Sequence, residues 1–132
     1  MDMVINLGDA KQGDFHAITE EIKSLKSVCG DNILKVIIEA CFLTNEEKIE
    51  LCHCVTDGGA DFIKTSTGFG SGGATLEDVQ LFKKHIGPNV QIKAAGGIRS
   101  ISDMKDYIAE GCSRIGASAA VELLKNHLDE EV

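Results

Sequence analysis

Apolar residues along the chain follow two alternating spacings, one typical of strands and the other of helices. Short apolar runs rich in β-branched residues predict strands at Met3–Asn6, Ile33–Glu39, Asp61–Lys64, Val90–Ala94 and Arg114–Ser118. Between them, apolar residues recur every three or four positions, which predicts helices. Their stripes are Ile18, Ile22, Leu25 and Val28; Ile49, Cys52 and Val55; Val79, Phe82 and Ile86; and Met104 and Ile108. Residues 8–13 are expected to form a loop, and a last helix is expected over residues 119–128.

Polar residues mark where these helices begin. Thr44 with Glu47 has the spacing of a capping box, and two further pairs resemble it. These are Thr75 with Asp78 and Ser100 with Asp103. Glycines follow the apolar stripes, as is usual at helix ends.

The regular alternation of strand and helix implies a parallel α/β sheet. Two arrangements fit: an open doubly wound sheet, and part of a (β/α)₈ TIM barrel. Polar residues at the carboxyl ends of several strands favour the barrel. A complete barrel takes about 250 residues, so a chain of 132 residues with five βα units cannot close one alone. We therefore predict one partial TIM-barrel domain over residues 1–132.

Charge and cysteine content narrow the set of partners. The net charge is −8, with 21 acidic residues against 13 basic ones, which argues against nucleic acid or an anionic membrane as the main partner. A phosphorylated ligand would need a local cationic or backbone N–H site. The five cysteines are odd in number and suggest reduced thiols in a cytoplasmic protein. No signal peptide or membrane span is expected.

Lysines end two of the predicted strands, Lys64 and Lys93. Adjacent parallel strands lie about 4.8 Å apart, so the two ammonium groups can approach closely if both point the same way. A like charge and partial burial both lower the pKa of a lysine amine. A neutral amine can attack a carbonyl and form a Schiff base. The alternative is that each lysine extends to solvent or pairs with an acid.

Lys35 is a third candidate, and strand alternation puts it on one face with Glu39. It could pair with Asp2 near the active lysines, or with Glu39 in a structural salt bridge.

Two glycine-containing segments suggest a phosphate site. Gly96-Gly97-Ile98-Arg99 and Gly116-Ala117-Ser118 each lie between a strand and a helix. Helix N-termini bind anions, and the loops after the last two strands of such barrels are the usual phosphate site. Arg99 would add a bidentate donor. The alternative is that each glycine only turns the chain.

Two other motifs are weak. Residues 68–73 match the spacing of a dinucleotide fingerprint, but no acidic strand end follows at the expected distance. We interpret them as a flexible substrate loop. Cys52, His53 and Cys54 do not share one helix face, so no metal site is expected there.

Taken together, four motifs closely resemble those of deoxyribose-phosphate aldolases. They are Lys35-Val36-Ile37-Ile38-Glu39, residues 61–68 (DFIKTSTG), residues 93–99 (KAAGGIR) and residues 114–118 (RIGAS). The first residues, from Asp2 to Asn6, fit as well. The resemblance implies a cytoplasmic, metal-independent TIM-barrel lyase of deoxyribose phosphate and nucleoside catabolism that needs no cofactor. It would cleave 2-deoxy-D-ribose 5-phosphate to D-glyceraldehyde 3-phosphate and acetaldehyde.

The resemblance also implies roles for individual residues. Lys64 would be the Schiff-base lysine, and Lys93 the neighbour that lowers its pKa. Asp2 would belong to the proton relay, with Lys35 ordering that site. The substrate's sugar would border Thr67 and Gly68, and its phosphate would be held by Gly96, Gly97, Arg99, Gly116 and Ser118.

The chain departs from the family pattern in length and in two side chains. It resembles only the C-terminal part of the family, from the fourth strand onward, without the first three βα units. Phe69 stands where some members carry a lysine near the phosphate. The only tyrosine, Tyr107, falls in a predicted helix, whereas some members end in a tyrosine that aids proton transfer.

The short length leaves other functions open. Two exposed sheet edges would favour a homo-oligomer. One alternative is a non-catalytic phosphate-binding half-barrel or oligomerisation module. Another is a phosphosugar isomerase, for which Glu39 would be the strand-end base.

Overall fold

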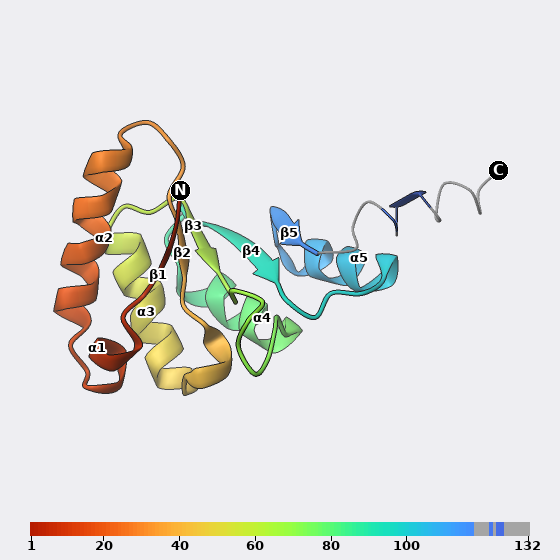
Figure 1. Ribbon diagram of the computed structural model, residues 1–132, viewed down its shortest axis with the longest axis horizontal. Helices are drawn as coiled ribbons and strands as arrows, with labels where there is room; N and C mark the ends of the chain where they lie inside the picture. Colours follow the sequence, from red (N-terminus) through yellow and green to blue (C-terminus); the bar gives the residue numbers. More distant parts are fainter. Residues whose placement is uncertain (118–121, 123, 126–132) are drawn as a thin grey trace.

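The computed structural model describes residues 1–117, 122, 124 and 125 of the chain (Figure 1). The strands are β1 (Asp2–Val4), β2 (Lys35–Ile37), β3 (Phe62–Lys64), β4 (Gln91–Ala95) and β5 (Arg114–Gly116). The helices are α1 (Leu7–Lys11), α2 (Phe15–Cys29), α3 (Asn45–Asp57), α4 (Leu76–His85) and α5 (Ile101–Glu110), with a short 3₁₀ helix η1 (Ala40–Phe42). The helix predicted over residues 119–128 falls largely outside the described residues.

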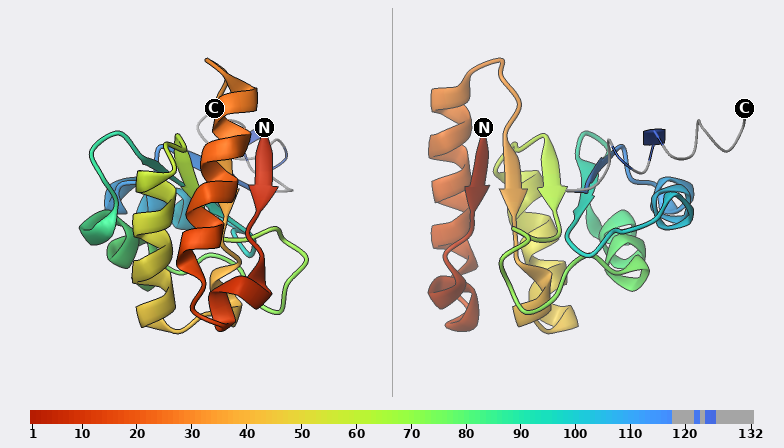
Figure 2. Two further views of the ribbon diagram at one scale, coloured as in Figure 1. Left: turned by 90° about the vertical axis from the view of Figure 1, so that its left-hand side faces the viewer. Right: turned by 45° about the vertical axis from the view of Figure 1, so that its right-hand side comes forward.

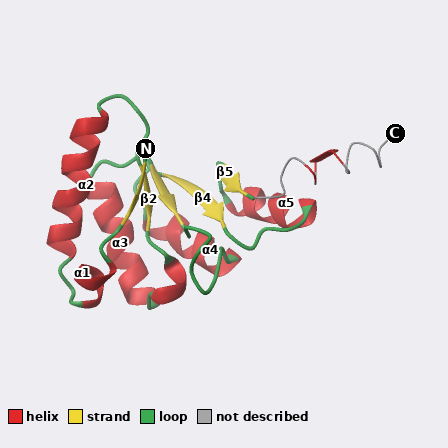
Figure 3. Ribbon diagram, in the orientation of Figure 1, coloured by secondary structure: helices red, strands yellow, loops and turns green. Residues whose placement is uncertain are grey.

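The strands form one parallel sheet in the order β1-β2-β3-β4-β5, labelled in Figure 1 and drawn in yellow in Figure 3. This consecutive order confirms the predicted βα repeat. Four strands are shorter than the apolar runs that predicted them. The first begins one residue earlier and ends at Val4, because Asn6 caps the following helix.

One face of the sheet is apolar and packs against the helices. It carries Met3, Val36, Ile63, Ile92 and Ala94, which join the main hydrophobic core. Neighbouring helices contact one another in the order α2, α3, α4 and α5, which matches the order of the strands (Figure 2). Burial of this apolar face supplies the main driving force for folding.

The other face of the sheet carries most of the charged residues. Strand register puts Asp2 beside Lys35, and Lys64 beside Lys93. Because side chains alternate along a strand, these residues project away from the helix layer. This face is where the predicted chemistry has to occur.

Two of the predicted apolar stripes are shifted by one residue. In α2, Ile18 and Ile22 are fully buried as predicted, but Val28 is 77% exposed and Cys29 is buried instead. In α5, Ile108 is exposed and Tyr107 is buried. In α2, helix geometry puts Cys29 closer than Val28 to the face that carries Ile18 and Ile22.

Helix starts were predicted well, with one exception. The Thr44 and Glu47 capping box is present, and Thr75 and Ser100 both accept hydrogen bonds as N-caps. The loop predicted at residues 8–13 was wrong in part, since α1 occupies its beginning. The Asn6 side chain accepts a hydrogen bond from the Asp9 backbone N–H, which starts this helix.

Candidate active site

Four charged side chains gather on the open face of the sheet. Asp2 lies between two lysines: its Oδ1 is 3.4 Å from Lys35 Nζ, and its Oδ2 is 3.3 Å from Lys64 Nζ. Lys93 lies next to Lys64 in the strand register. The prediction that Asp2, Lys35, Lys64 and Lys93 share one site is therefore consistent with the geometry. Of the two partners considered for Lys35, the structure has Asp2.

The Asp2 carboxylate is held in its charged form. Burial raises its pKa, but hydrogen bonding and charge from Lys64 and Lys35 outweigh that effect, and the net pKa is below the usual value of 3.8. Asp2 is thus an anion at neutral pH that can orient both ammonium groups.

Lys93 has a pKa below the usual lysine value of 10.5. Burial is the largest cause, and the positive charges of Lys64 and Lys35 add to it, while Asp2 opposes the shift. Lys93 therefore gives up its proton more readily than an isolated lysine would.

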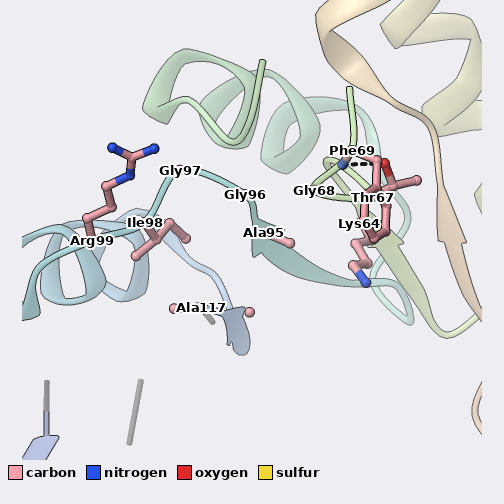
Figure 4. Close-up of a pocket in the computed structure, with 11 residues that line it drawn as sticks. Lys64, Thr67, Gly68, Phe69, Ala95, Gly96, Gly97, Ile98, Arg99 and Ala117 are labelled. Atoms are coloured by element: carbon pink, nitrogen blue, oxygen red, sulfur yellow. Dashed lines mark hydrogen bonds between the residues drawn. The ribbon is translucent and has the colours of Figure 1, made fainter. Parts of the chain in front are cut away.

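A cavity of about 490 Å³ opens beside this cluster (Figure 4). Its size is in the range of small-molecule sites. Lys64 lies at one end and Arg99 at the other (Figure 4). The lining includes Lys64, Thr67, Gly68, Phe69, Gly96, Gly97, Arg99, Gly116 and Ala117. Ser118 lies outside the described residues.

Glycine shapes the end of the cavity near Arg99. Gly96 and Gly97 have φ values of 85° and 73°, which other residues rarely adopt. A Cβ on Gly73 would lie 2.3 Å from the carbonyl oxygen of Gly96, so this close approach needs glycine. The two loops therefore contact each other backbone to backbone beside the cavity, just before α5 begins. Arg99 lines this end of the cavity beside the N-terminus of α5, and a guanidinium near a helix N-terminus is suited to an anion.

Glu39 is a residue for which sequence analysis suggested a different role. It does not pair with Lys35. Its carboxylate accepts hydrogen bonds from the Thr67 backbone N–H, at 3.0 Å, and from Thr67 Oγ1, at 2.6 Å. Its φ is 52°, a left-handed conformation that costs roughly 1–2 kcal/mol for a residue other than glycine. A buried acid directly after an apolar strand was the signal in the sequence, but its partner could not be read from spacing.

Within residues 1–117, 122, 124 and 125, no three His, Cys, Asp or Glu side chains are arranged to hold a metal ion. Cys52 and Cys54 are buried, and burial raises the pKa of the Cys52 thiol to about 12. Across the same residues, every helix is too short or too polar to cross a membrane.

Known proteins resemble this chain along nearly its whole length. A deoxyribose-phosphate aldolase of Clostridium botulinum is 63% identical over 125 residues, which cover 95% of this chain and 57% of that protein. The solved structure of "QR15, an Aldolase" matches 96% of this chain and 59% of its own, with a TM-score of 0.87 and 39% identity. The tetrameric deoxyribose phosphate aldolase of Aeropyrum pernix matches 96% of this chain and 53% of its own, with a TM-score of 0.78 and 30% identity.

The chain thus spans a little over half the length of these relatives. The structural matches confirm the predicted fold class, a partial TIM barrel built from parallel βα units. The family model for "DeoC/LacD family aldolase" matches residues 1–129, and the chain belongs to this family of aldolases.

Proposed function

We propose that this chain carries the catalytic residues of a class I aldolase that cleaves 2-deoxy-D-ribose 5-phosphate to D-glyceraldehyde 3-phosphate and acetaldehyde. The observation that carries the proposal is the position of Lys64. Its side chain borders the cavity and is 13% exposed, with Lys93 beside it and Asp2 within 3.3 Å. The names of the relatives support the choice of substrate.

In this proposal Lys64 is the nucleophile. Its neutral amine attacks the sugar's carbonyl carbon, and loss of water gives an iminium ion. The iminium withdraws electrons, so the bond between the second and third sugar carbons breaks while the hydroxyl on the third carbon loses its proton to the relay that includes Asp2. That carbon becomes the aldehyde of glyceraldehyde 3-phosphate, which leaves. The remaining enamine takes up a proton, and hydrolysis releases acetaldehyde and the free lysine.

Lys93 and Asp2 prepare the amine for this reaction. Lys93 places a second positive charge beside Lys64, and a like charge disfavours the protonated form of an amine. Asp2 orients Lys64 and, through a proton relay, exchanges protons with the reacting groups. Lys35 holds the Asp2 carboxylate in place from the opposite side, at 3.4 Å.

The far end of the cavity takes the phosphate. Gly96, Gly97 and Arg99 provide backbone N–H groups and a guanidinium, and Gly116 and Ser118 complete the site. Thr67 and Gly68 border the sugar between the two ends. This assignment needs neither a metal nor a cofactor.

We further propose that the chain assembles into a homo-oligomer in the cytoplasm. Strands β1 and β5 are the edges of the sheet, and open edges favour pairing with another chain. The Aeropyrum pernix relative is tetrameric. Residues 1–132 act as one domain in this proposal.

Trapping of the Schiff base tests the proposed chemistry. The chain is incubated with acetaldehyde and sodium borohydride, which should leave one ethyl group on Lys64, located by peptide mass spectrometry. Lys64→Ala should lose the adduct. Lys84→Ala is the matched control, because Lys84 is exposed on α4 and does not line the cavity.

The rival proposal is a non-catalytic phosphate-binding half-barrel. Trapping distinguishes the two proposals. An aldolase should be labelled at Lys64 far more than at Lys84, whereas a binding module should be labelled similarly at both lysines. Equal labelling of both lysines would reject the aldolase proposal, and phosphate binding without an adduct would favour the rival.

A further inference from the structure

The carboxylate of Glu39 is buried beneath the loop that borders the cavity. Only 6% of the residue is exposed, although it carries a charge-bearing side chain. Its Oε1 accepts from the Thr67 backbone N–H and its Oε2 from Thr67 Oγ1. The left-handed backbone at Glu39 is unusual for this residue type, and such conformations tend to be kept where they serve function.

The hydrogen bonds of Thr67 determine what its hydroxyl can offer a ligand. A hydroxyl has one hydrogen to donate and two lone pairs to accept with. A carboxylate can only accept, so the hydrogen of Thr67 Oγ1 goes to Glu39 at 2.6 Å. The Phe69 backbone N–H can only donate, and it occupies one lone pair at 3.0 Å. One lone pair remains, so Thr67 Oγ1 can only accept from a further partner.

The loop that carries Thr67 is also held at its other end, independently of Glu39. The Ala74 backbone N–H donates to the carbonyl oxygens of Ala95 and Gly96, both at 3.1 Å. The hydroxyl of the buried Tyr107 donates to the Ala74 carbonyl oxygen at 2.9 Å. A change at Glu39 should therefore alter the hydroxyl of Thr67 without releasing the whole loop.

We propose that Glu39 is a positioning residue that fixes Thr67 Oγ1 as a hydrogen-bond acceptor, so that the cavity selects a ligand hydroxyl over a group that cannot donate. The identity of that hydroxyl rests on the proposed function. It is one of the two sugar hydroxyls that lie between the carbon at Lys64 and the phosphate at Arg99. An analogue that lacks this hydroxyl binds more weakly, because it forgoes the hydrogen bond to the remaining lone pair of Thr67 Oγ1.

Two substitutions separate this role from a purely structural one. Glu39→Gln keeps an oxygen for the Thr67 N–H, but its NH₂ group donates to Oγ1 and frees the threonine hydrogen for a ligand. Glu39→Gly removes the carboxylate and suits the φ of 52°. Glu46→Gln is the control, since it neutralises an exposed glutamate in the first turn of α3.

The first measurement needs no ligand. A threonine hydroxyl held by a buried carboxylate exchanges slowly with water, so its proton should be visible by NMR in the wild type and in Glu46→Gln. It should be lost or strongly shifted in Glu39→Gln and Glu39→Gly. No such resonance in the wild type, or an unchanged one in Glu39→Gln, would overturn the proposal.

The second measurement is the affinity for a ligand that cannot form a Schiff base. The probes are 2-deoxyribitol 5-phosphate and its 3-fluoro and 4-fluoro analogues, since fluorine cannot donate. In the wild type, one of the two fluoro analogues should bind about tenfold more weakly than the parent. In Glu39→Gln that ratio should fall to about threefold or less, because the freed hydrogen can now be donated. Glu39→Gly should bind the parent ligand more weakly than the wild type does. Glu39→Gln should bind it more tightly than Glu39→Gly does.

The outcomes separate the two proposals. An equal fluorine penalty in the wild type and in Glu39→Gln would overturn the role of Glu39 while leaving the substrate class intact. If the parent ligand fails to bind the wild type, the proposed substrate is wrong, and the Thr67 hydroxyl resonance alone decides the role of Glu39.

Discussion

The contact between Gly73 and Gly96 gives a sharp prediction about the end of the cavity that is proposed to hold phosphate. A Cβ on Gly73 would lie 2.3 Å from the Gly96 oxygen and 2.4 Å from its carbonyl carbon, whereas ordinary contacts begin at 3.4 Å. Both obstacles are backbone atoms, which cannot rotate away. In Gly73→Ala the two loops must therefore separate by about 1 Å.

That separation should affect both stability and binding. Overpacking of this kind destabilises the folded state by about 1–3 kcal/mol. Alanine also lowers the conformational entropy of the unfolded chain, which stabilises the folded state by about 0.4–1 kcal/mol. We expect the free energy of unfolding to fall by about 1–2 kcal/mol. The hydrogen bonds from the Ala74 N–H to Ala95 and Gly96 would weaken as well. Loss of one hydrogen bond to a charged group costs about 1.5–3 kcal/mol, so phosphate affinity should fall by at least about tenfold.

Urea unfolding and NMR titration with inorganic phosphate measure the two effects. Gly13→Ala is the control, because Gly13 has a φ of 78° and open space around its Cβ position. It should lose about 1–2 kcal/mol of stability from backbone strain alone, with unchanged phosphate affinity. Wild-type phosphate affinity in Gly73→Ala would refute the argument that this contact shapes the site.

Two further predictions concern charges outside the cavity. Lys48 and Asp78 form a 2.7 Å ion pair with 12% and 9% of their side chains exposed, so Lys48→Met should cost about 3–5 kcal/mol in urea unfolding. The double variant with Asp78→Leu should recover most of that loss, and no recovery would argue against an uncompensated charge as its cause. Burial raises the pKa of Asp61, but Lys26 and the Leu34 N–H outweigh this and lower it below 3.8. Its stabilising effect should thus be present above pH 3.8 and vanish as the pH falls through the lower folded value, so that the stability advantage over Asp61→Asn disappears in acid. An advantage that is independent of pH would contradict this.

The sheet and the positions of its charged residues were predictable because the signals are local. Short apolar runs and the Thr44 and Glu47 capping box depend on neighbouring residues alone. Parallel pairing then follows from the alternation of strand and helix, and it puts Lys64 and Lys93 side by side. The pairing of Asp2 with Lys35 was one of two possibilities, since Glu39 lay on the same predicted strand face as Lys35.

Two features were missed. The stripe predicted for α2 ended on Val28, although the helical period puts Cys29 closer to the face of Ile18 and Ile22, and Cys29 is the buried residue. Glu39 was assigned to a strand face, but its left-handed backbone turns the side chain toward Thr67 instead. Strand alternation does not apply past the end of a strand, so this contact could not be inferred from periodicity.

The central claim is that the cationic neighbour Lys93 keeps the Lys64 amine available at moderate pH. The most direct test is the rate of borohydride trapping by acetaldehyde as a function of pH, in the wild type and in Lys93→Leu. A neighbouring cation disfavours the protonated form of an amine, so removal of the Lys93 charge should move the trapping profile to more alkaline pH. Superimposable profiles for the two proteins would contradict the claim.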